Sequence, residues 1–149
     1  MPVGEICSRE VWFVGRDDTV VEAAQLMRDH HVGALVVTEL RGGVPHPVGI
    51  LTDRDIVVEI VAKEADLARL LVGDVMSYEL VSVREDDGIS EALKVMKGKG
   101  VRRAPVLDDR GELIGILAVD DLIGLLAEEL ADVSALIDRE QERERRSRK

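Results

Sequence analysis

Aromatic side chains, cysteine and long apolar runs are scarce in this sequence of 149 residues. Its three aromatic residues, Trp12, Phe13 and Tyr78, are too few for the stacking platforms that bind single-stranded nucleic acid. The single cysteine, Cys7, excludes an intrachain disulfide framework and suits a reducing compartment. No run reaches membrane-spanning length and the first ten residues lack a secretory signal pattern, so we expect a cytoplasmic protein without a membrane segment.

Positive charge is also in short supply, because 20 Lys and Arg residues stand against 30 Asp and Glu residues and the net charge is −10. Such a balance disfavours binding to DNA, RNA and anionic membranes. Apolar residues, by contrast, make up 46% of the chain. That fraction is enough to bury a core, either in one compact unit or in two halves that share it.

Catalytic and metal-binding patterns are missing as well. His30 and His31 are neighbours that would point in different directions on a helix, and His46 lies in a Gly/Pro stretch, so with Cys7 they form no zinc pattern. The sequence has no Gly-Lys-Ser/Thr phosphate loop and no nucleophile elbow. We therefore expect neither catalysis nor a required cofactor or metal, and an enzyme acting through Cys7 or the carboxylates is kept as a third hypothesis.

An internal repeat organises the chain. Residues 18–27 align with residues 87–96, an offset of 69 (87 − 18). The first copy starts with a capping box, Thr19-x-x-Glu22. Both copies have apolar residues at i, i+3, i+4 and i+7, which predicts an amphipathic helix with one buried stripe. The stripes are Val20, Ala23, Ala24 and Met27 in the first copy and Ile89, Ala92, Leu93 and Met96 in the second.

The same order of predicted elements surrounds each helix. An extended piece precedes it, an apolar strand follows it, and a turn leads to a second strand and a closing helix. In the first copy these segments are 11–14, 34–37, a long turn at 41–47 and the closing 49–56; in the second they are 80–83, 104–107, a short turn at 108–111 and the closing 115–122. Each unit thus reads strand–helix–strand–strand–helix. About 60 residues bury their own face poorly, so we expect an α+β fold in which two units pack around a pseudo-twofold axis.

The remaining segments are expected to join or follow the repeats. We assign residues 6–63 and 74–131 to the repeats, and residues 64–73 to a linker with a short helix through Leu67, Leu70 and Leu71. Residues 132–149 form a charged helical tail with no apolar stripe beyond Leu136 and Ile137. A solvated helix end is the expectation for this tail, and a partner-binding or membrane-surface arm is the alternative.

The first closing segment, Gly49-Ile-Leu-Thr-Asp-Arg-Asp-Ile56, has the groups that hold a nucleotide. A hydroxyl at Thr52, where a helix starts, can donate to phosphate, and a carboxylate at Asp55 can accept from the two hydroxyls of a ribose. The same Thr-x-x-Asp spacing also fits a capping box that only satisfies the helix's own N–H groups. The twin segment has Ala118-x-x-Asp121 instead, so the fold does not require the box, and this favours the ligand hypothesis modestly.

Two copies in register, each closing with Gly-apolar-apolar-x-x-x-Asp, resemble a tandem pair of cystathionine-beta-synthase (CBS) domains, a Bateman module, over about residues 6 to 130. The resemblance implies two repeats packed through their sheets with two clefts between them. It also implies that these clefts bind adenosine-containing ligands: AMP, ADP, ATP or S-adenosylmethionine, with Mg²⁺ where phosphates require it. Paired modules of this family form discs through exposed helix faces, so the resemblance further implies a homodimer.

Carried over by position, the resemblance places a first cleft around Thr52, Arg54 and Asp55. Adenine would meet backbone opposite them, and an arginine ahead of the central strand would neutralise phosphate. A solvated loop is the equal alternative for those arginines. The positions expected opposite are Met76, Ser77, Leu80, Val81, Arg102, Arg103, Ala104 and Pro105.

The second cleft departs from the family pattern. It would use Asp121 opposite residues of the opening strand, but Ala118 replaces the hydroxyl residue. We expect this cleft to bind phosphate poorly, and to be empty or to hold a less charged adenosine compound. The positions opposite are Ser8, Val11, Trp12 and Phe13.

These inferences predict a regulatory adenine-nucleotide-binding module that acts on a protein partner the sequence does not identify. A ligand-free structural homodimer with vestigial clefts is the first alternative. A module that binds S-adenosylmethionine is the second.

Overall fold

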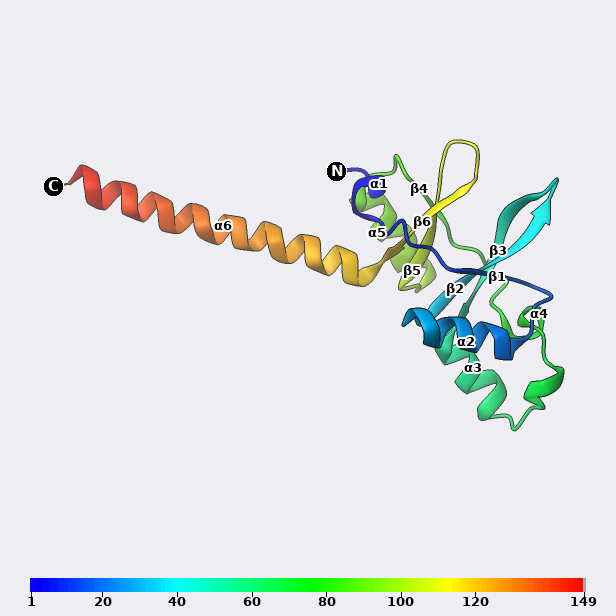
Figure 1. Cartoon of the computed structure of the whole chain (residues 1–149). Coiled ribbons are helices and arrows are strands. Elements are labelled where there is room, and N and C mark those ends of the chain that lie inside the picture. Colours follow the sequence, from blue (N-terminus) through cyan, green and yellow to red (C-terminus); the bar gives the residue numbers. More distant parts are fainter. Residues whose placement is uncertain (149) are drawn as a thin grey trace. The chain divides into compact units, whose positions relative to one another are not determined.

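The computed structural model describes residues 1–148, and its helices and strands form two repeats with the same order of main elements (Figure 1). The first repeat contains α1 (Val3–Ile6), β1 (Phe13–Gly15), α2 (Val20–His30), β2 (Ala34–Arg41), β3 (Val44–Thr52), α3 (Asp53–Ile56) and the π-helical turn η1 (Val57–Val61). A 3₁₀ turn, η2 (Leu67–Arg69), follows. The second repeat contains α4 (Val72–Val75), β4 (Val83–Arg84), α5 (Ile89–Lys99), β5 (Arg103–Leu107), β6 (Leu113–Ala118) and α6 (Val119–Ser147).

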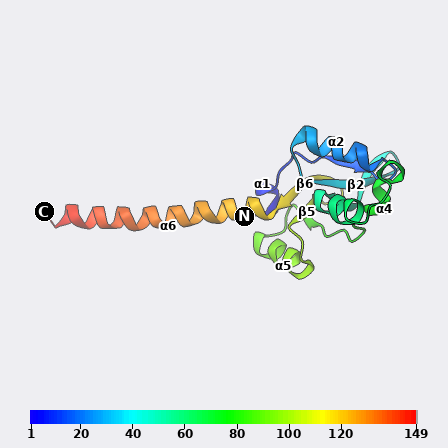
Figure 2. The same cartoon turned by 90° about the horizontal axis from the view of Figure 1, so that it is seen from below.

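Two three-stranded sheets of the same design confirm the predicted α+β class. Their strand orders are β1-β2-β3 and β4-β5-β6, and the first two strands of each sheet run parallel. The chain divides into two compact units, Met1–Leu117 and the helix that starts after it. Within the first unit, α2 lies beside α3 (Figure 1), and α2 and α5 lie on opposite sides of the strands (Figure 2).

The predicted repeat helices form as α2 and α5. The capping box of α2 is confirmed, since Thr19 Oγ1 accepts from Glu22 N at 3.1 Å and Glu22 Oε2 accepts from Thr19 N at 3.0 Å. Of the predicted stripe of α2, Val20, Ala23 and Met27 are buried and Ala24 is half-buried. On α5 the stripe is narrower than predicted: Ala92 and Met96 are buried, but Leu93 is 37% exposed.

The long turn predicted at 41–47 is wrong. Only Gly42 and Gly43, with φ of 59° and 80°, form the turn, and the residues after them pair antiparallel with β2 from Arg41↔Val44 to Thr38↔Pro47. Two consecutive positive φ values give the tight turn that matches the twist of a hairpin. The two prolines of this stretch fit because β3 is an edge strand, where a missing N–H costs no ladder bond.

Three other predicted segments are shorter or shifted. The opening extended pieces become strands only at Phe13–Gly15 and Val83–Arg84, where parallel pairing with β2 and β5 begins. In the linker, the helical turn covers Leu67–Arg69, while Leu70 and Leu71 are extended and precede α4. These local errors follow from hydrogen bonds to distant strands, which the apolar pattern does not specify.

The segments at the N-terminal ends of the two repeats are exchanged, because each one binds to the other repeat. We call residues 2–8 and 71–77, which contain α1 and α4, the lead segments. In the second lead segment, Val72 N donates to Asp18 O and Gly73 N to Arg16 O, both at 2.8 Å. In the first lead segment, the same two donors 69 residues earlier (72 − 3) bond to Asp87 O and Glu85 O, again at 2.8 Å. Each lead segment therefore binds the loop after the opening strand of the other repeat.

The core of the first repeat contains part of the second lead segment. Val72 and Met76 pack in one cluster with the buried faces of α2, β2 and β3. The remaining buried members of that cluster are Val14, Ala23, Met27, Leu35, Val37 and Leu51. Because side chains of both halves fill one core, the exchange contributes to stability directly.

The second unit is the single helix α6, which runs from Val119 to Ser147. The charged tail predicted at 132–149 continues this helix as far as residue 147. Within residues 1–148, no helix is both long and apolar enough to cross a membrane.

Candidate functional site

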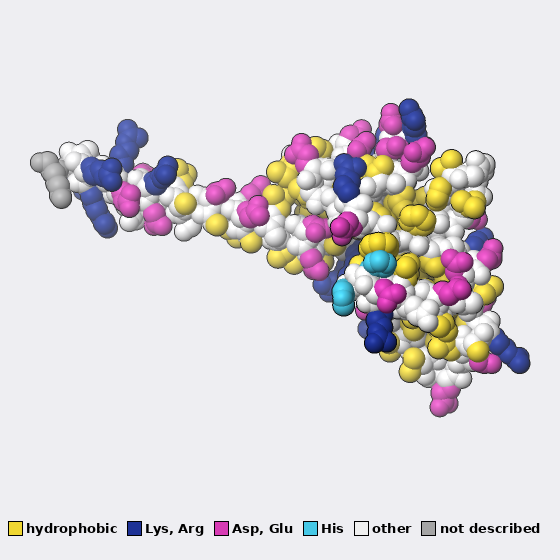
Figure 3. All heavy atoms as spheres, viewed as in Figure 1, with side chains coloured by type: hydrophobic (Ala, Val, Ile, Leu, Met, Phe, Trp, Pro, Cys, Tyr) yellow, Lys and Arg dark blue, Asp and Glu magenta, His cyan; other side chains and the backbone are white. Residues whose placement is uncertain are grey.

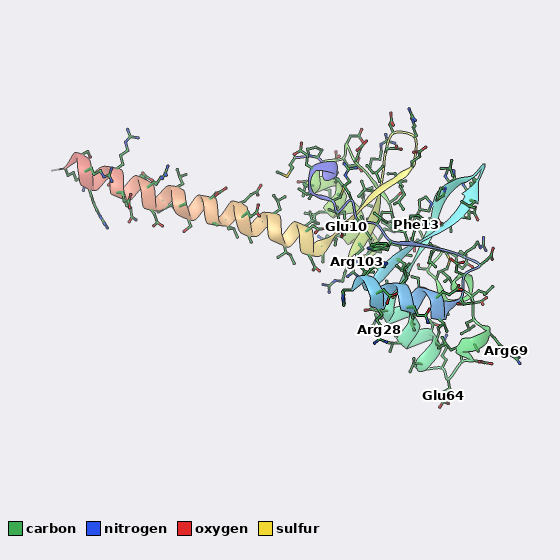
Figure 4. The ribbon with its side chains drawn as sticks, in the orientation of Figure 1. Glu10, Phe13, Arg28, Glu64, Arg69 and Arg103 are labelled. Carbon is green, nitrogen blue, oxygen red and sulfur yellow. The ribbon has the colours of Figure 1, made fainter. Side chains whose placement is uncertain are left out.

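A pocket of about 420 Å³ in the first unit combines segments far apart in the sequence. The end of β3 and the start of α3 contribute Thr52, Arg54 and Asp55. The stretch after α4 contributes Ser77 and Val81. The start of β5 and the residues before it contribute the arginines Arg102 and Arg103 (Figure 4 labels Arg103). Ligand pockets in proteins typically enclose about 300–1,000 Å³, so the space suits a nucleotide-sized molecule.

Seven of the eleven residues predicted for the first cleft line this pocket. They are Thr52, Arg54, Asp55, Ser77, Val81, Arg102 and Arg103. Leu80 does not line it. Met76 packs into the core of the first repeat, and Ala104 and Pro105 are buried within β5.

Thr52 and Asp55 form a complete capping box. Thr52 N donates to Asp55 Oδ2 at 2.9 Å, and Asp55 N donates to Thr52 Oγ1 at 3.1 Å. The box does not exhaust either side chain: the Thr52 hydroxyl hydrogen is still a donor, and a carboxylate can accept about four hydrogen bonds. The capping and ligand hypotheses are therefore compatible, because one geometry serves both.

Five lining residues were not predicted. Ile50 and Val101 add apolar surface, Gly100 ends α5 with φ of 67°, and Asp53 and Glu79 add carboxylates. The Gly-apolar-apolar motif already contained Ile50, and Asp53 lies beside Thr52, so sequence spacing could have identified these two. Glu79 lies in a stretch without regular structure, where spacing specifies no side-chain direction.

The charges of the lining side chains balance. Three arginines, at positions 54, 102 and 103, meet three carboxylates, at positions 53, 55 and 79, which gives 3 − 3 = 0. Glu79 also pairs with Lys99 at 2.9 Å, and Asp53 Oδ1 accepts from Arg54 N at 2.8 Å. An anionic group entering beside the arginines would therefore meet donors, while carboxylates remain for hydroxyl groups.

Gly49 permits the close approach of β3 to the segment at Ser77, and Ile50 and Ser77 line the pocket. A Cβ at this position would lie 2.2 Å from Ser77 O and 2.3 Å from Met76 Cε, closer than atoms can approach. Ser77 pairs instead with the next residue, Ile50, through N–O distances of 3.0 and 3.3 Å. The glycine of the motif is thus explained by packing between the repeats.

The structure does not place the two sides of the predicted second cleft relative to one another. Ser8, Val11 and Phe13 belong to the first unit, and Asp121 belongs to α6. Ser8 pairs with Ile116, the counterpart of the pairing between Ser77 and Ile50. In α6, Asp121 Oδ2 accepts from the N–H of residue 118 at 3.0 Å, so half of a capping box persists without the hydroxyl. The second cleft remains a prediction.

Among residues 1–148, no group of three or more His, Cys, Asp or Glu side chains is arranged to hold a metal ion. Trp12, predicted near the second cleft, stacks on His30 with ring centroids 3.4 Å apart. The pocket at Thr52 is therefore the candidate site that the geometry supports best.

Comparisons with known proteins agree with the resemblance of the sequence to a pair of CBS domains. The CBS domain family model matches residues 3–62 and 72–128. An uncharacterised protein of Methanopyrus kandleri is 37% identical over 121 residues, which cover 81% of this chain and 60% of that protein. The CBS domain-containing protein YhcV of Bacillus subtilis is 38% identical over 120 residues, 80% of this chain and 81% of its own length. The chain therefore spans less than two thirds of the first of these relatives.

A similar fold is seen in the CBS domain pair of protein MJ0100. Its structure, a complex with 5′-methylthioadenosine and S-adenosyl-L-methionine, superposes with a TM-score of 0.75 over 87% of this chain and 98% of that chain. The sequences are 22% identical, so this comparison establishes the fold alone.

Proposed function

The chain belongs to the CBS domain family, and on that premise we propose that it is a regulatory module that binds an adenine nucleotide, AMP, ADP or ATP. The observation that carries the proposal is the pocket in which Thr52 and Asp55 share one space with Arg102 and Arg103. A diol acceptor, a hydroxyl donor, guanidinium groups and apolar walls are the partners that a ribose, a phosphate and a base need.

Each part of a nucleotide has a candidate partner in this pocket. Asp55 accepts from the ribose hydroxyls while its Oδ2 still caps Thr52 N. The Thr52 hydroxyl and the guanidinium of Arg103 donate to phosphate. The base lies against Ile50 and Val81, which supply apolar surface. The complex of the MJ0100 domain pair with 5′-methylthioadenosine and S-adenosyl-L-methionine supports adenosine-containing compounds as the class of ligand.

A regulatory role is possible for this pocket because its lining residues come from both repeats. The α3 side of the pocket belongs to the first repeat, and the β5 side belongs to the second. A ligand that contacts both sides stabilises the arrangement in which they are correctly spaced. Only a difference in affinity between two arrangements can transmit a signal, so the partner protein must distinguish the bound arrangement from the free one.

The test is titration calorimetry of the purified protein with AMP, ADP, ATP and S-adenosylmethionine, each with and without Mg²⁺. We expect saturable binding of at least one adenine nucleotide at one site, and a loss of at least tenfold in affinity for Asp55→Asn. Chromatography of the titrated sample should return the nucleotide unchanged, because the module binds and does not turn over its ligand. Absence of binding by all four compounds would favour the ligand-free structural dimer, and binding of S-adenosylmethionine alone would replace the nucleotide in the proposal.

A further inference from the structure

Two charged side chains beside the pocket form an ion pair to which the proposed function assigns no role. Lys99 Nζ donates to Glu79 Oε1 at 2.9 Å, and Glu79 lines the pocket. Lys99 is the last residue of α5, and Gly100 after it also lines the pocket. The ammonium group therefore lies next to the pocket wall, although Lys99 is not itself a lining residue.

The stability of the fold does not explain this ion pair. The side chains of Lys99 and Glu79 are 55% and 69% exposed, and ion pairs as exposed as this one contribute little to stability. The equivalent positions of the first repeat, 69 residues earlier (99 − 30 and 79 − 10), are His30 and Glu10 (Figure 4 labels Glu10). There His30 stacks on Trp12 instead. The first repeat thus folds without a Lys–Glu pair at this place.

The charges around the pocket match a nucleotide with one phosphate better than one with three. The charges of the lining side chains sum to zero, and Lys99 brings the total to 4 − 3 = +1. A phosphate monoester carries about two negative charges near neutral pH, and each added phosphate contributes about one more. AMP would therefore leave a charge of about −1 in the pocket, and ATP about −3. Charge without a partner costs affinity when it is removed from water.

The first unit as a whole also disfavours additional phosphates. Residues 1–117 contain 21 acidic and 14 basic residues, a net charge of 14 − 21 = −7. Figure 3 shows acidic side chains spread over the visible face of this unit, with fewer basic ones between them. A negative field lowers the local concentration of polyanions, so a longer phosphate chain needs a nearby cation in compensation. The Lys99 ammonium lies beside the pocket but is bound to Glu79.

We propose that the ion pair between Glu79 and Lys99 makes the pocket select AMP over ATP, an inference that rests on the proposed binding of an adenine nucleotide. The single phosphate of AMP has Thr52 and Arg103 as partners. The further phosphates of ATP meet the negative charge of Glu79, which also keeps the Lys99 ammonium from them. A repulsive element of this kind produces specificity by weakening the binding of the wrong ligand.

The first test compares the affinities of AMP and ATP for the full chain by titration calorimetry in EDTA, so that no metal ion offsets the charge of ATP. We expect the parent chain to bind AMP about tenfold more tightly than ATP, or better. Glu79→Gln keeps the shape of the side chain, removes its charge and releases Lys99, so the ratio of ATP to AMP affinity should rise about fivefold or more. The rise should shrink at high salt, because salt screens exposed charges.

The matched control for this variant is Glu10→Gln. It removes the same charge at the equivalent position of the first repeat, outside the residues that line the pocket, and should leave the ratio of affinities unchanged. Thermal unfolding of each variant should show a melting temperature close to that of the parent, since Glu79 and Glu10 are both exposed.

The second test asks whether Lys99 is the group that Glu79 withholds from phosphate. In the double variant Glu79→Gln/Lys99→Met, the gain in ATP affinity should be largely lost. In Glu79→Gln/Lys97→Met, which removes another cation from the last turn of α5, the gain should remain. A gain of the same size in both double variants would overturn the role of the ion pair.

The outcomes separate this inference from the proposed function. If the parent chain binds ATP as tightly as AMP, or if Glu79→Gln leaves the ratio unchanged, the proposed selectivity is wrong while nucleotide binding stands. If the parent chain binds neither nucleotide, the proposed function is wrong and the selectivity fails with it.

Discussion

Thr52 and Asp55 hold each other through two reciprocal hydrogen bonds of 2.9 and 3.1 Å at the edge of the candidate pocket. Thr19 and Glu22 form the same box at the start of α2, which lies outside the residues that line the pocket. The acceptor distance at the threonine hydroxyl is 3.1 Å in both. The box at Thr19 is therefore a control for the box at Thr52, because it caps a helix in the same way but lies outside the pocket.

Replacing each threonine by valine tests this separation. Both Thr52→Val and Thr19→Val remove a capping oxygen with little change in shape, and each should lower the free energy of unfolding by about 1 kcal/mol. Only Thr52→Val should weaken nucleotide binding, because Thr52 lines the pocket and Thr19 does not. Denaturant unfolding and calorimetric titration of the two variants measure both quantities. Equal affinities in the two variants would show that Thr52 is a cap and nothing more.

Arg103 should contribute to the binding of phosphate and not of the nucleoside. Arg103→Ala is expected to weaken AMP binding by about tenfold or more, since a hydrogen bond to a charged group contributes about 1.5–3 kcal/mol, and to leave adenosine binding nearly unchanged. Arg110→Ala, in the exposed connection between β5 and β6, is the matched control. A parallel loss of AMP and adenosine affinity would instead place Arg103 beside the base or the ribose.

The lack of space around Gly49 predicts that one added methyl group lowers the stability of the fold. Gly49→Ala would drive a Cβ against Ser77 O and Met76 Cε, and we expect a loss of stability of about 1–3 kcal/mol from overpacking. Gly98→Ala in α5 is the control, because its Cβ would meet no atom within 4 Å outside the adjacent residues and the backbone of its own helix, and alanine favours helix. It should raise stability slightly. Thermal unfolding of the two variants checks both signs.

We expect the charge of Glu39 to make the free energy of unfolding depend on pH in the acid range. The Arg41 side chain, which donates to Glu39 Oε1 at 2.9 Å, lowers the pKa of this carboxyl, and Arg16 lowers it further. Because the folded-state pKa is depressed, the stabilisation is present above the unfolded-state pKa and is lost as the pH falls through the folded-state pKa. Glu39→Gln should therefore lower the melting temperature slightly at neutral pH, and the difference from the parent should disappear in acid.

The control for that titration is Glu112→Gln, an exposed glutamate just before β6. At neutral pH its melting temperature should lie close to that of the parent. A constant difference between Glu39→Gln and the parent across the whole range would mean that the charge of Glu39 is not responsible.

Periodicity predicted the parts of the fold that depend on local sequence. The helices α2 and α5, the capping box at Thr19 and the two strands after α5 form close to where the pattern placed them. The hairpin at Gly42 was misjudged because prolines usually interrupt strands, and the edge position that tolerates them depends on the neighbouring strands.

The exchange of lead segments was not identified from the sequence, although a signal for it was present. Val-Gly-Glu-Ile-Cys at 3–7 and Val-Gly-Asp-Val-Met at 72–76 repeat at the same offset of 69 as the helices. The alignment would have extended each repeat toward its N-terminus. It would not have shown which repeat each segment binds, because that choice depends on tertiary hydrogen bonds such as the one from Val72 N to Asp18 O.

The exchange has a consequence for how the two halves fold. An isolated first repeat would lack Val72 and Met76 in its core, and an isolated second repeat would lack the bonds from Val3 N and Gly4 N. Each half is therefore an incomplete folding template that the other completes. Joining them in one chain makes this complementation unimolecular, so that its effective concentration is set by the short linker and not by the amount of protein in solution.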